Sequence, residues 1–491
     1  MPQRSNQLVM MSGRDGDEGL NRRLVIHNVH LDLDDDGHAG TELYDVVCVD
    51  GIVDTISPAG CKDTEFTDLA DSPDRCDLEQ LDAEGRGILL PALCHGHIHL
   101  DKCFLLDKCD DLVSGDFTEA LKVTAKAKSA FPADTEDLYD RGKRLITESV
   151  ECGVTLMRAH VEVDRTVNMC CLEAGLRLRE EFQDICDVQI AAFAQDPLFA
   201  SLDDEHPGRN LDLLRNASRR AGVQAVGSAP YVEPSTEHAK RNIKLILDTA
   251  IENRLHVDFH LDYNVDLTSE PLIWYVLEQL HERIRSGRWH AGAHVCIGHA
   301  TRLTLFSADE WTRFCQLVCE NDLPVTLVGL PPSDLYMMGR NLPQAPRSTL
   351  NVPKLAREYG LKIGMSVNNI ENAFTPQGPL DPLALCPLGV AIFQAGTRQD
   401  CRTLLEAVTL NTRTAIGHAT MSPLTGESTS TCGLVPTIGN VADFVLLHDN
   451  ETAYSAALNP SYSRTTIKAG VIVSRRLAKK WLREKKTVQS L

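Results

Sequence analysis

Short apolar runs rich in β-branched residues recur along the chain, and helical spacing of apolar residues follows several of them. The clearest helical segment has Ile243, Ile246, Leu247 and Ala250 on one face, with charged residues between them. A strand, a helix and another strand in succession imply parallel neighbours, because parallel strands need a crossover connection. The runs predict eight strands, which are Ile88–Leu93, Val154–Ala159, Val188–Ala194, Val223–Ala229, Leu255–Phe259, Ala293–Gly298, Val325–Gly329 and Leu361–Val367.

Eight strand–helix units in succession are typical of a (β/α)8 barrel. A doubly wound sheet usually carries a Gly-rich loop after its first strand, and this sequence has no such loop there. We therefore predict an α/β fold whose main part, residues 91–420, is a TIM-type (β/α)8 barrel.

The two flanks of the predicted barrel differ from it, because both contain short β-branched strands separated by Asp and Gly turns. We predict that residues 23–90 and 421–475 pair into one small β-sandwich domain formed by both chain termini. Residues 1–22 are polar and are expected to form a disordered tail, and residues 476–491 are expected to form a basic C-terminal tail.

The composition of the chain argues against several classes of partner. The chain has 491 residues, of which 43% are hydrophobic, enough for a large core. Its net charge of −20 argues against nucleic acid and anionic membranes as partners, since both require basic patches. No apolar run reaches the length of a membrane span, and residues 1–25 lack a secretory apolar region. We expect a cytoplasmic protein that acts on a small-molecule substrate.

The positions of several histidines predict a metal site. His97 and His99 alternate on an extended segment, so their side chains point the same way and can hold one divalent metal ion. His260 and His299 follow the fifth and sixth predicted strands, and the carboxyl ends of barrel strands converge at one site. This arrangement favours a metal-dependent hydrolase. The other polar residues at predicted strand ends are Arg158, His160, Gln195, Asp196, Tyr231, Glu233 and Asn368.

Several stretches resemble the cytosine deaminase branch of the amidohydrolase superfamily, which also includes triazine-ring amidohydrolases. The resemblance extends from about Leu24 to Val473, with the stretches in the same order and spacing. The matching stretches are Leu81–Arg86, His97–Lys102, Arg158–Asp164, Gln189–Gln195, Val257–Asp262, Ile297–Ala300, Met338–Arg340, Ser366–Phe374 and Pro376–Gly378.

The resemblance implies that four histidines occupy metal-site positions and bind one divalent ion, zinc or iron. They are His97, His99, His260 and His299. Neutral imidazoles suit either metal. The first βα loop carries Asp101 and Lys102, which are expected to brace it.

The resemblance also implies two substrate-binding residues. Gln195 matches a glutamine that hydrogen-bonds the substrate ring, and a carboxamide offers a donor and an acceptor side by side. A loop-capping amide is the alternative for Gln195. His160 is expected to hydrogen-bond a tetrahedral intermediate, with bracing of a neighbouring ligand as its alternative.

Two substitutions fall on the groups that are catalytic in the family. Asn368 stands where the resemblance places an aspartate that ligates the metal and acts as a base, and a carboxamide cannot accept that proton. Tyr263 stands where deaminases have a proton-shuttling glutamate, and a phenol with a pKa of about 10 returns a proton poorly. Each lost acid–base group typically costs about 10²–10⁴-fold in rate.

Three hypotheses follow from these substitutions. In the first, another carboxylate takes over, with Glu371 as the leading candidate beside Asp262, Glu162 and Asp164. In the second, the chain binds a metal and a heterocycle but turns over little. In the third, no metal binds and the histidines are relics in a structural barrel.

The predicted function is that of a metal-dependent amidohydrolase or deaminase. It hydrolyses a non-peptide C–N bond in a small cyclic amidine or amide, such as a pyrimidine- or triazine-like ring. Asn368, Tyr263 and Glu371 are the residues expected to decide catalysis. The alternative is a catalytically impaired pseudoenzyme of the same fold that binds a metal or ligand. Barrels of this kind often self-associate, so a homo-oligomer is compatible with the resemblance, although no motif indicates an interface.

Overall fold

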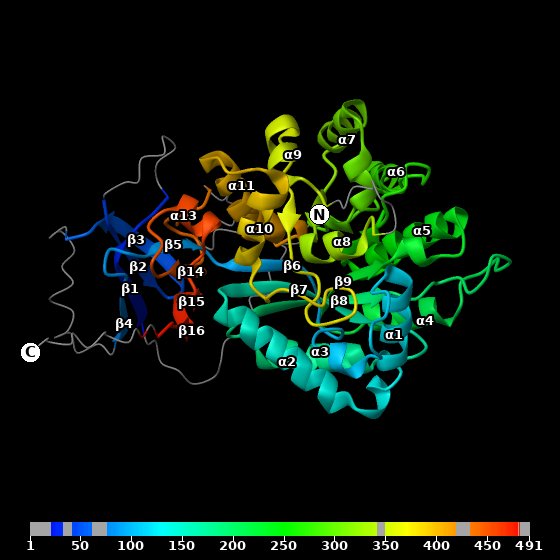
Figure 1. Cartoon of the computed structure of the whole chain (residues 1–491), viewed down its shortest axis with the longest axis horizontal. Helices are drawn as coiled ribbons and strands as arrows, with labels where there is room; N and C mark the ends of the chain where they lie inside the picture. The colour runs from blue at the N-terminus through cyan, green and yellow to red at the C-terminus, as the bar shows by residue number, and fades with distance from the viewer. Residues whose placement is uncertain are drawn as a thin grey trace, which may run out of the picture.

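The structure, a computed structural model, describes residues 21–32, 42–60, 76–340, 349–418, 433–479 and Trp481. A barrel surrounded by helices lies beside a smaller β-structure, which is at the left in Figure 1. Of the disordered tail predicted for residues 1–22, the structure describes only residues 21–22, which belong to a strand, and of the basic tail predicted for residues 476–491 it describes residues 476–479 and Trp481.

Eight parallel strands form the barrel, and each pairs with the next one along the chain. They are β6 (Leu93–His99), β7 (Val154–Glu162), β8 (Asp187–Ala194), β9 (Val223–Ser228), β10 (His256–Leu261), β11 (Val295–His299), β12 (Val325–Gly329) and β13 (Gly364–Met365). A parallel bridge between Ile98 and Asn368 joins the segment after β13 back to β6, so the sheet closes on itself. The predicted α/β fold with a TIM-type barrel is confirmed.

Helices connect most of the strands and surround the barrel (Figure 1). The segment predicted to be helical lies within α5, which begins where the Ser235 side chain accepts a hydrogen bond from the His238 N–H. The helices are α1 (Phe117–Lys128), α2 (Thr135–Glu151), α3 (Cys170–Glu181), α4 (Arg209–Ser218), α5 (Thr236–Asn253), α6 (Ile273–Arg285), α7 (Ala308–Glu320), α8 (Pro331–Met337), α9 (Val352–Tyr359), α10 (Leu385–Phe393), α11 (Arg398–Val408), α12 (Leu410–Ala415) and α13 (Ala453–Leu458). None of the helices in the described ranges combines the length and apolarity needed to cross a membrane.

The first predicted strand, Ile88–Leu93, is wrong in its extent. Its residues belong to two elements, because β5 (Ile88–Pro91) pairs with a strand outside the barrel and β6 begins the barrel at Leu93. Both elements are almost wholly buried, so the run of apolar residues carries no periodicity that separates them. As a result, His97 and His99 lie within the first barrel strand rather than after it.

A β-sandwich stands beside the barrel. One sheet has the order β3-β2-β1-β4 and the other has the order β16-β15-β14-β5. Leu24 and Val46 from the first sheet pack against Phe444 and Ile467 from the second, in one apolar core. The predicted sandwich from both chain termini is therefore present. Its remaining strands are β1 (Asn21–Val29), β2 (Tyr44–Val49), β3 (Ile52–Pro58), β4 (Cys76–Asp82), β14 (Phe444–Leu447), β15 (Arg464–Lys468) and β16 (Val471–Arg476).

Strand β7 shows how the barrel acquires a polar interior. All nine of its residues are buried, as expected for a parallel strand that is covered on both faces. Arg158, His160 and Glu162 occupy alternate positions and therefore the same side of the strand. Arg158 and His160 both contact Asp258 of β10, so this side faces the barrel axis.

A buried ion pair fixes the sandwich to the barrel. Arg464 of β15 donates from Nη1 to Asp381 Oδ1 at 2.7 Å and from Nη2 to Asp381 Oδ2 at 2.6 Å. Its Nη1 also donates to the Cys152 carbonyl, at the end of α2, at 2.7 Å. Asp381 lies on the barrel side, shortly before α10, so one guanidinium links three parts of the chain.

We expect Arg464→Met to lower the free energy of unfolding by about 3–5 kcal/mol, because it leaves the Asp381 carboxylate buried without its partner. Urea denaturation followed by circular dichroism measures this change. Arg475→Met is the matched control, since Arg475 pairs with Glu79 at the surface, where loss of an ion pair costs about 0–1 kcal/mol. Equal losses in the two variants would contradict the assignment.

Candidate metal centre

The four histidines assigned to a metal from the sequence lie close together inside the barrel. His97 and His99 come from β6, His260 from β10 and His299 from the end of β11. The His260 ring centroid lies 4.4 Å from that of His97, 5.0 Å from that of His99 and 5.4 Å from that of His299. All four side chains are buried. Barrel closure thus brings residues from distant parts of the chain into one cluster.

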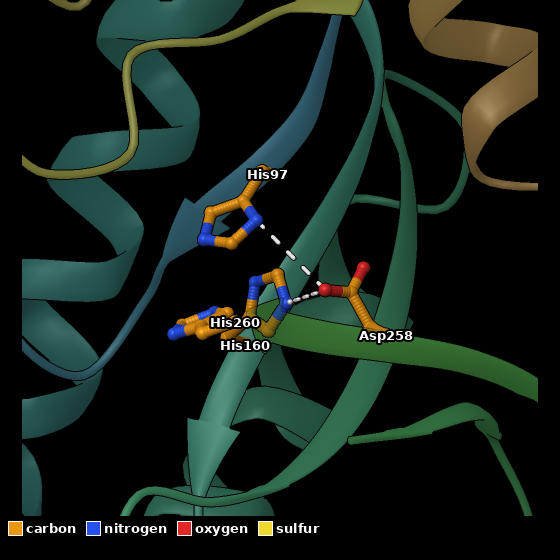
Figure 2. A group of neighbouring side chains, drawn as sticks. All are labelled: His97, His160, Asp258 and His260. Carbon is orange, nitrogen blue, oxygen red and sulfur yellow. Dashed lines mark ion pairs between the residues drawn. The ribbon is translucent and has the colours of Figure 1, made fainter. Parts of the chain in front are cut away.

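His160 and Asp258 extend the cluster inward. The His97 and His160 ring centroids are 4.2 Å apart, and Asp258 Oδ1 lies 3.1 Å from His160 Nε2 and 3.8 Å from His97 Nδ1 (Figure 2). His97, His160, Asp258 and His260 offer ligand atoms that all lie within 4.8 Å of one another. Sequence reasoning missed Asp258, although its place two residues before His260 on a strand directs both side chains to the same side.

His160 and Arg158 together favour the ionised form of Asp258. Burial alone would raise the pKa of this carboxyl, but His160 and Arg158 beside it lower the pKa well below its usual value. The Arg158 Nη1 atom lies 3.1 Å from Asp258 Oδ2, and both side chains are fully buried. Arg158 also donates to Gln189 Oε1 and to the Ile416 carbonyl. A fixed negative charge therefore sits beneath the histidines.

Several ring nitrogens of the cluster have no hydrogen-bond partner among the described residues. They are both nitrogens of His97, Nδ1 of His99 and Nε2 of His260. Burial, with the neighbouring histidines, lowers the pKa of His97 and of His260 well below the usual value. These rings are neutral, the form that ligates a metal, and a buried nitrogen without a partner is costly unless something binds it.

His299 is held on two sides. Its Nδ1 lies 2.8 Å from Asp334 Oδ1, and Asp334 Oδ2 accepts from the Leu330 N–H and the Thr349 hydroxyl. The Tyr263 ring stacks on the imidazole, with centroids 3.7 Å apart and an interplanar angle of 27°. Burial raises the pKa of Asp334, and the hydrogen bond to His299 opposes that rise. Such a carboxylate fixes the tautomer and orientation of the histidine. Asp334 was not predicted from the sequence.

Asn368 lies at the closure of the barrel. Its N–H donates to the His97 carbonyl at 3.2 Å, and its carbonyl accepts from the His99 N–H at 2.9 Å. The side-chain Nδ2 donates to Ser333 Oγ at 2.6 Å, whereas the buried Oδ1 has no partner among the described residues. The side chain therefore offers one neutral buried oxygen, on a residue whose backbone pairs with that of His97 and His99.

Tyr263 joins the histidine cluster to an aromatic group, because its ring stacks on His299 and also contacts Phe117 and Tyr231. Its ring centroid is 5.6 Å from that of Phe117 on α1 and 5.9 Å from that of Tyr231, and Phe117 also contacts Phe374. Burial raises the pKa of Tyr263 well above its usual value, and its hydroxyl donates to the Ser333 carbonyl. Tyr263 is therefore a neutral phenol at physiological pH.

Glu371 and Asp262, two of the carboxylates weighed as replacements, have other partners. The Glu371 side chain is 51% exposed and lies 3.7 Å from Arg144. The Asp262 carboxylate accepts from the backbone N–H groups of Leu272 and Ile273, and burial raises its pKa to about 7. The structure brings neither of them into the group of ligand atoms around His97.

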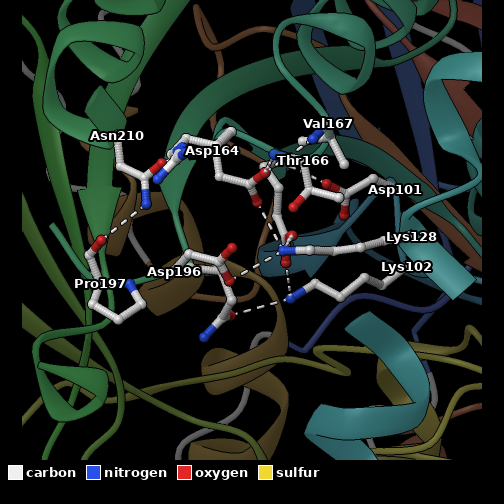
Figure 3. Close-up of polar contacts among 12 residues, drawn as sticks. Asp101, Lys102, Lys128, Asp164, Thr166, Val167, Asp196, Pro197 and Asn210 are labelled. Carbon is white, nitrogen blue, oxygen red and sulfur yellow. Dashed lines mark hydrogen bonds and ion pairs between the residues drawn. The ribbon is translucent and has the colours of Figure 1, made fainter. Parts of the chain in front are cut away.

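Glu162 and Asp164, the other two carboxylates, belong to a buried network with two lysines, Lys102 and Lys128. Figure 3 shows these lysines with Asp164 and Asp196. Lys128, the last residue of α1, lies 3.0 Å from Glu162 Oε2, 2.7 Å from Asp164 Oδ2 and 3.1 Å from Asp196 Oδ1. Lys102 lies 2.5 Å from Glu162 Oε1. Both oxygens of Glu162 thus bind ammonium groups, and α1 is held electrostatically to β7 and to the segment after β8.

Gln195 and His160, the two predicted substrate-binding residues, also have partners. Gln195 Oε1 accepts from Lys102 Nζ at 3.1 Å, and Nε2 donates to the Tyr231 hydroxyl at 3.3 Å. His160 Nδ1 lies 3.3 Å from the Ile98 carbonyl, and its Nε2 faces Asp258. Both ring nitrogens of His160 therefore lie near protein oxygens, whereas Gln195 is half-buried at the carboxyl end of β8.

Comparison with known proteins gives one curated relative, and no protein-family model matches the chain. The relative is the N-isopropylammelide isopropyl amidohydrolase of Pseudomonas sp. (strain ADP), which is 28% identical over 193 residues. The match covers 38% of this chain and 44% of the relative, so it spans less than half the length of that protein.

Solved structures match nearly the whole chain. The 5-methylcytosine deaminase from Klebsiella pneumoniae has a TM-score of 0.76 at 22% identity, with 94% of this chain and 100% of that chain covered. The N-isopropylammelide isopropylaminohydrolase from Burkholderia multivorans has a TM-score of 0.69 at 22% identity, with coverage of 93% and 99%. The fold of this chain is therefore that of the cytosine deaminase-like amidohydrolases, which confirms the resemblance inferred from its sequence.

Proposed function

We propose that the chain is a metal-dependent hydrolase of a non-peptide C–N bond in a small cyclic amidine or amide. The observation that carries the proposal is the buried histidine cluster, whose neutral rings present nitrogens without partners at the carboxyl ends of barrel strands. Burial of that many unpaired ring nitrogens would be costly in a barrel that never binds an ion. The donor set fits one divalent metal, zinc or iron.

His97, His99 and His260 would hold the ion, with His299 beside them and Asn368 Oδ1 as a neutral oxygen donor. When bound, such an ion lowers the pKa of a coordinated water and polarises the substrate. Asp258 Oδ1 lies 3.8 Å from His97 Nδ1, too far for a hydrogen bond, but its negative charge favours a hydrogen on that nitrogen and so keeps the Nε2 lone pair available. Asp334 does the same for His299. The two carboxylates act as positioning residues.

A pyrimidine- or triazine-like ring is the proposed substrate. The aromatic group of Phe117, Tyr231, Tyr263 and Phe374 lies beside the histidine cluster, and aromatic side chains pack favourably against a planar ring. The names of the matched proteins support the same class, since they specify a methylcytosine and an isopropylammelide. Ring hydrolysis with loss of ammonia or an amine is the reaction that we propose.

A catalytically impaired metal- or ligand-binding protein is the second candidate. It is favoured by Asn368, which has no charge, and by Tyr263, whose raised pKa makes it a poor proton shuttle at physiological pH. In that case the centre would bind a metal and a ring, but hydrolysis would be slow.

Metal content is the first test. Protein purified without chelator is expected to contain about one equivalent of zinc or iron, and His97→Ala/His99→Ala is expected to lose it because two imidazole ligands are removed. Elemental analysis measures the content. His206→Ala is the control, since His206 is exposed and should leave the metal in place. Absence of metal from the unaltered protein would overturn the proposal.

Removal of the carboxylate behind His299 should weaken the metal centre. We expect Asp334→Asn to reduce zinc affinity by about 10–100-fold, the usual effect of losing a carboxylate that orients a ligand. Competition with a chromophoric chelator measures the affinity. Asp309→Asn makes the same change at an exposed position on α7 and should have no effect. An unchanged zinc affinity in Asp334→Asn would contradict the assignment of His299 to the metal centre.

Restoring a carboxylate at position 368 separates the two candidate functions. We expect Asn368→Asp to raise ammonia release from aminopyrimidines or aminotriazines by about 10²-fold or more, because it supplies a base. The Ser333 hydroxyl that now accepts from Asn368 can donate to the new carboxylate. Asn216→Asp, at an exposed position on α4, is the control. If rate and metal occupancy both stay unchanged, position 368 has no catalytic part.

A further inference from the structure

A cavity of about 670 Å³ lies between α8 and α10, which are both labelled in Figure 1. Its wall is formed by α8, by the segment after β13 and by the first part of α10. Most of the wall is apolar, and it includes Leu335 and Tyr336 from α8 and Leu385 and Leu388 from α10. Pockets of about 300–1,000 Å³ with mainly apolar walls are typical binding sites for small molecules. The cavity therefore has the size and the lining of a ligand site.

The cavity is separate from the proposed metal centre. The described residues that line it include none of the histidines. On α8, Asp334 contacts His299, whereas the next two residues, Leu335 and Tyr336, line the cavity. Val367 also lines the cavity, one residue before the position that closes the barrel. A molecule in the cavity would therefore not occupy the place proposed for the substrate ring.

Arg340 adds a positive charge to the wall of the cavity. Its side chain is half-buried, with Nη1 donating to the Ser114 carbonyl at 2.9 Å and Nη2 donating to the Tyr336 carbonyl at 3.1 Å. The buried Nε has no hydrogen-bond partner among the described residues, and none of their carboxylates forms an ion pair with the guanidinium. The guanidinium lies 4.7 Å from the centroid of the Tyr336 ring, a favourable cation–π contact. A half-buried cation that meets only neutral groups favours an anion as a further partner.

The carboxylate in the wall of the cavity already has a partner. Asp381 accepts from Arg464 through both of its oxygens, so its negative charge is neutralised by that guanidinium. Gln377, which also lines the cavity, donates from Nε2 to the Pro332 carbonyl at 3.0 Å. Among the described lining residues, Arg340 is therefore the charged group that lacks an opposite charge.

We propose that this cavity binds a small carboxylic acid with an apolar body, in its ionised form. The carboxylate accepts hydrogen bonds from Arg340, because a planar guanidinium matches the two oxygens of a carboxylate. The apolar body packs against Tyr336, Leu385 and Leu388. The inference does not rest on the proposed hydrolase function, since it uses no residue of the metal centre.

A matched pair of ligands tests the requirement for charge. 1-Naphthaleneacetic acid and 1-naphthaleneacetamide share an apolar body, but only the acid carries a negative charge at neutral pH. We expect the acid to bind at least about tenfold more tightly than the amide, because its hydrogen bonds with Arg340 are charge-assisted. Isothermal titration calorimetry measures both affinities. Equal affinities, or no binding of the acid, would overturn the proposal.

Two variants locate the site. Arg340→Met removes the charge but keeps an apolar side chain, and we expect it to bind the acid and the amide equally. Leu388→Trp places a larger side chain in the cavity and should abolish the binding of both ligands. Arg398→Met is the matched control, since Arg398 is exposed on α11 and lies over the Tyr454 ring at 5.1 Å. A preference for the acid that survives Arg340→Met would overturn the proposal, whether or not Leu388→Trp folds.

A carboxylate can also bind a metal ion, so the metal centre requires its own control. His97→Ala/His99→Ala should bind the acid as tightly as the unaltered protein does, because neither residue lines the cavity. Loss of binding in that variant would assign the acid to the metal and would overturn the proposal. Failure of the hydrolase proposal has a different signature, since a protein that neither contains metal nor releases ammonia should still bind the acid in this cavity.

Discussion

The interior of this barrel depends on the buried pair of Arg158 and Asp258. Each of these side chains is fully buried, and a single unpaired charge at that depth would be severely destabilising. Arg158 spreads its remaining hydrogens over Gln189 and the Ile416 carbonyl, while Asp258 turns its other oxygen toward His160 and His97. The two opposite charges neutralise each other, and the second oxygen of Asp258 orients the imidazole rings of His160 and His97.

The other carboxylates near the proposed metal centre are also buried charges that need partners. Glu162 is shared by two lysines, Asp262 accepts two backbone N–H groups where α6 begins, and Asp334 is tied to His299. Each of these acids is engaged by a hydrogen bond or an ion pair with the protein, which a catalytic base would have to give up. The Asn368 side chain, by contrast, carries no charge and has a buried oxygen without a partner among the described residues.

Much of the barrel could be predicted from sequence, because parallel strands appear as apolar runs and polar residues at their ends stand out. The converging histidines followed directly from that placement. The boundary at Leu93 could not be predicted, since β5 and β6 form one continuous buried run. Asp258 was not identified from the sequence, because it lies inside a strand rather than at its end. Asp334 was hidden because it sits on the short helix α8, and only the fold brings it to His299.

Asn368 joins the end of the barrel to its beginning through its peptide groups alone, and its backbone is left-handed, with φ of 70°. That conformation is unfavourable for branched or bulky side chains and is tolerated by asparagine and aspartate. Among residues with a polar side chain, the backbone thus favours asparagine and aspartate, which share one shape and differ in charge. Because closure of the barrel uses only the peptide groups of Asn368, exchange of its amide nitrogen for an oxygen would leave the closing hydrogen bonds in place.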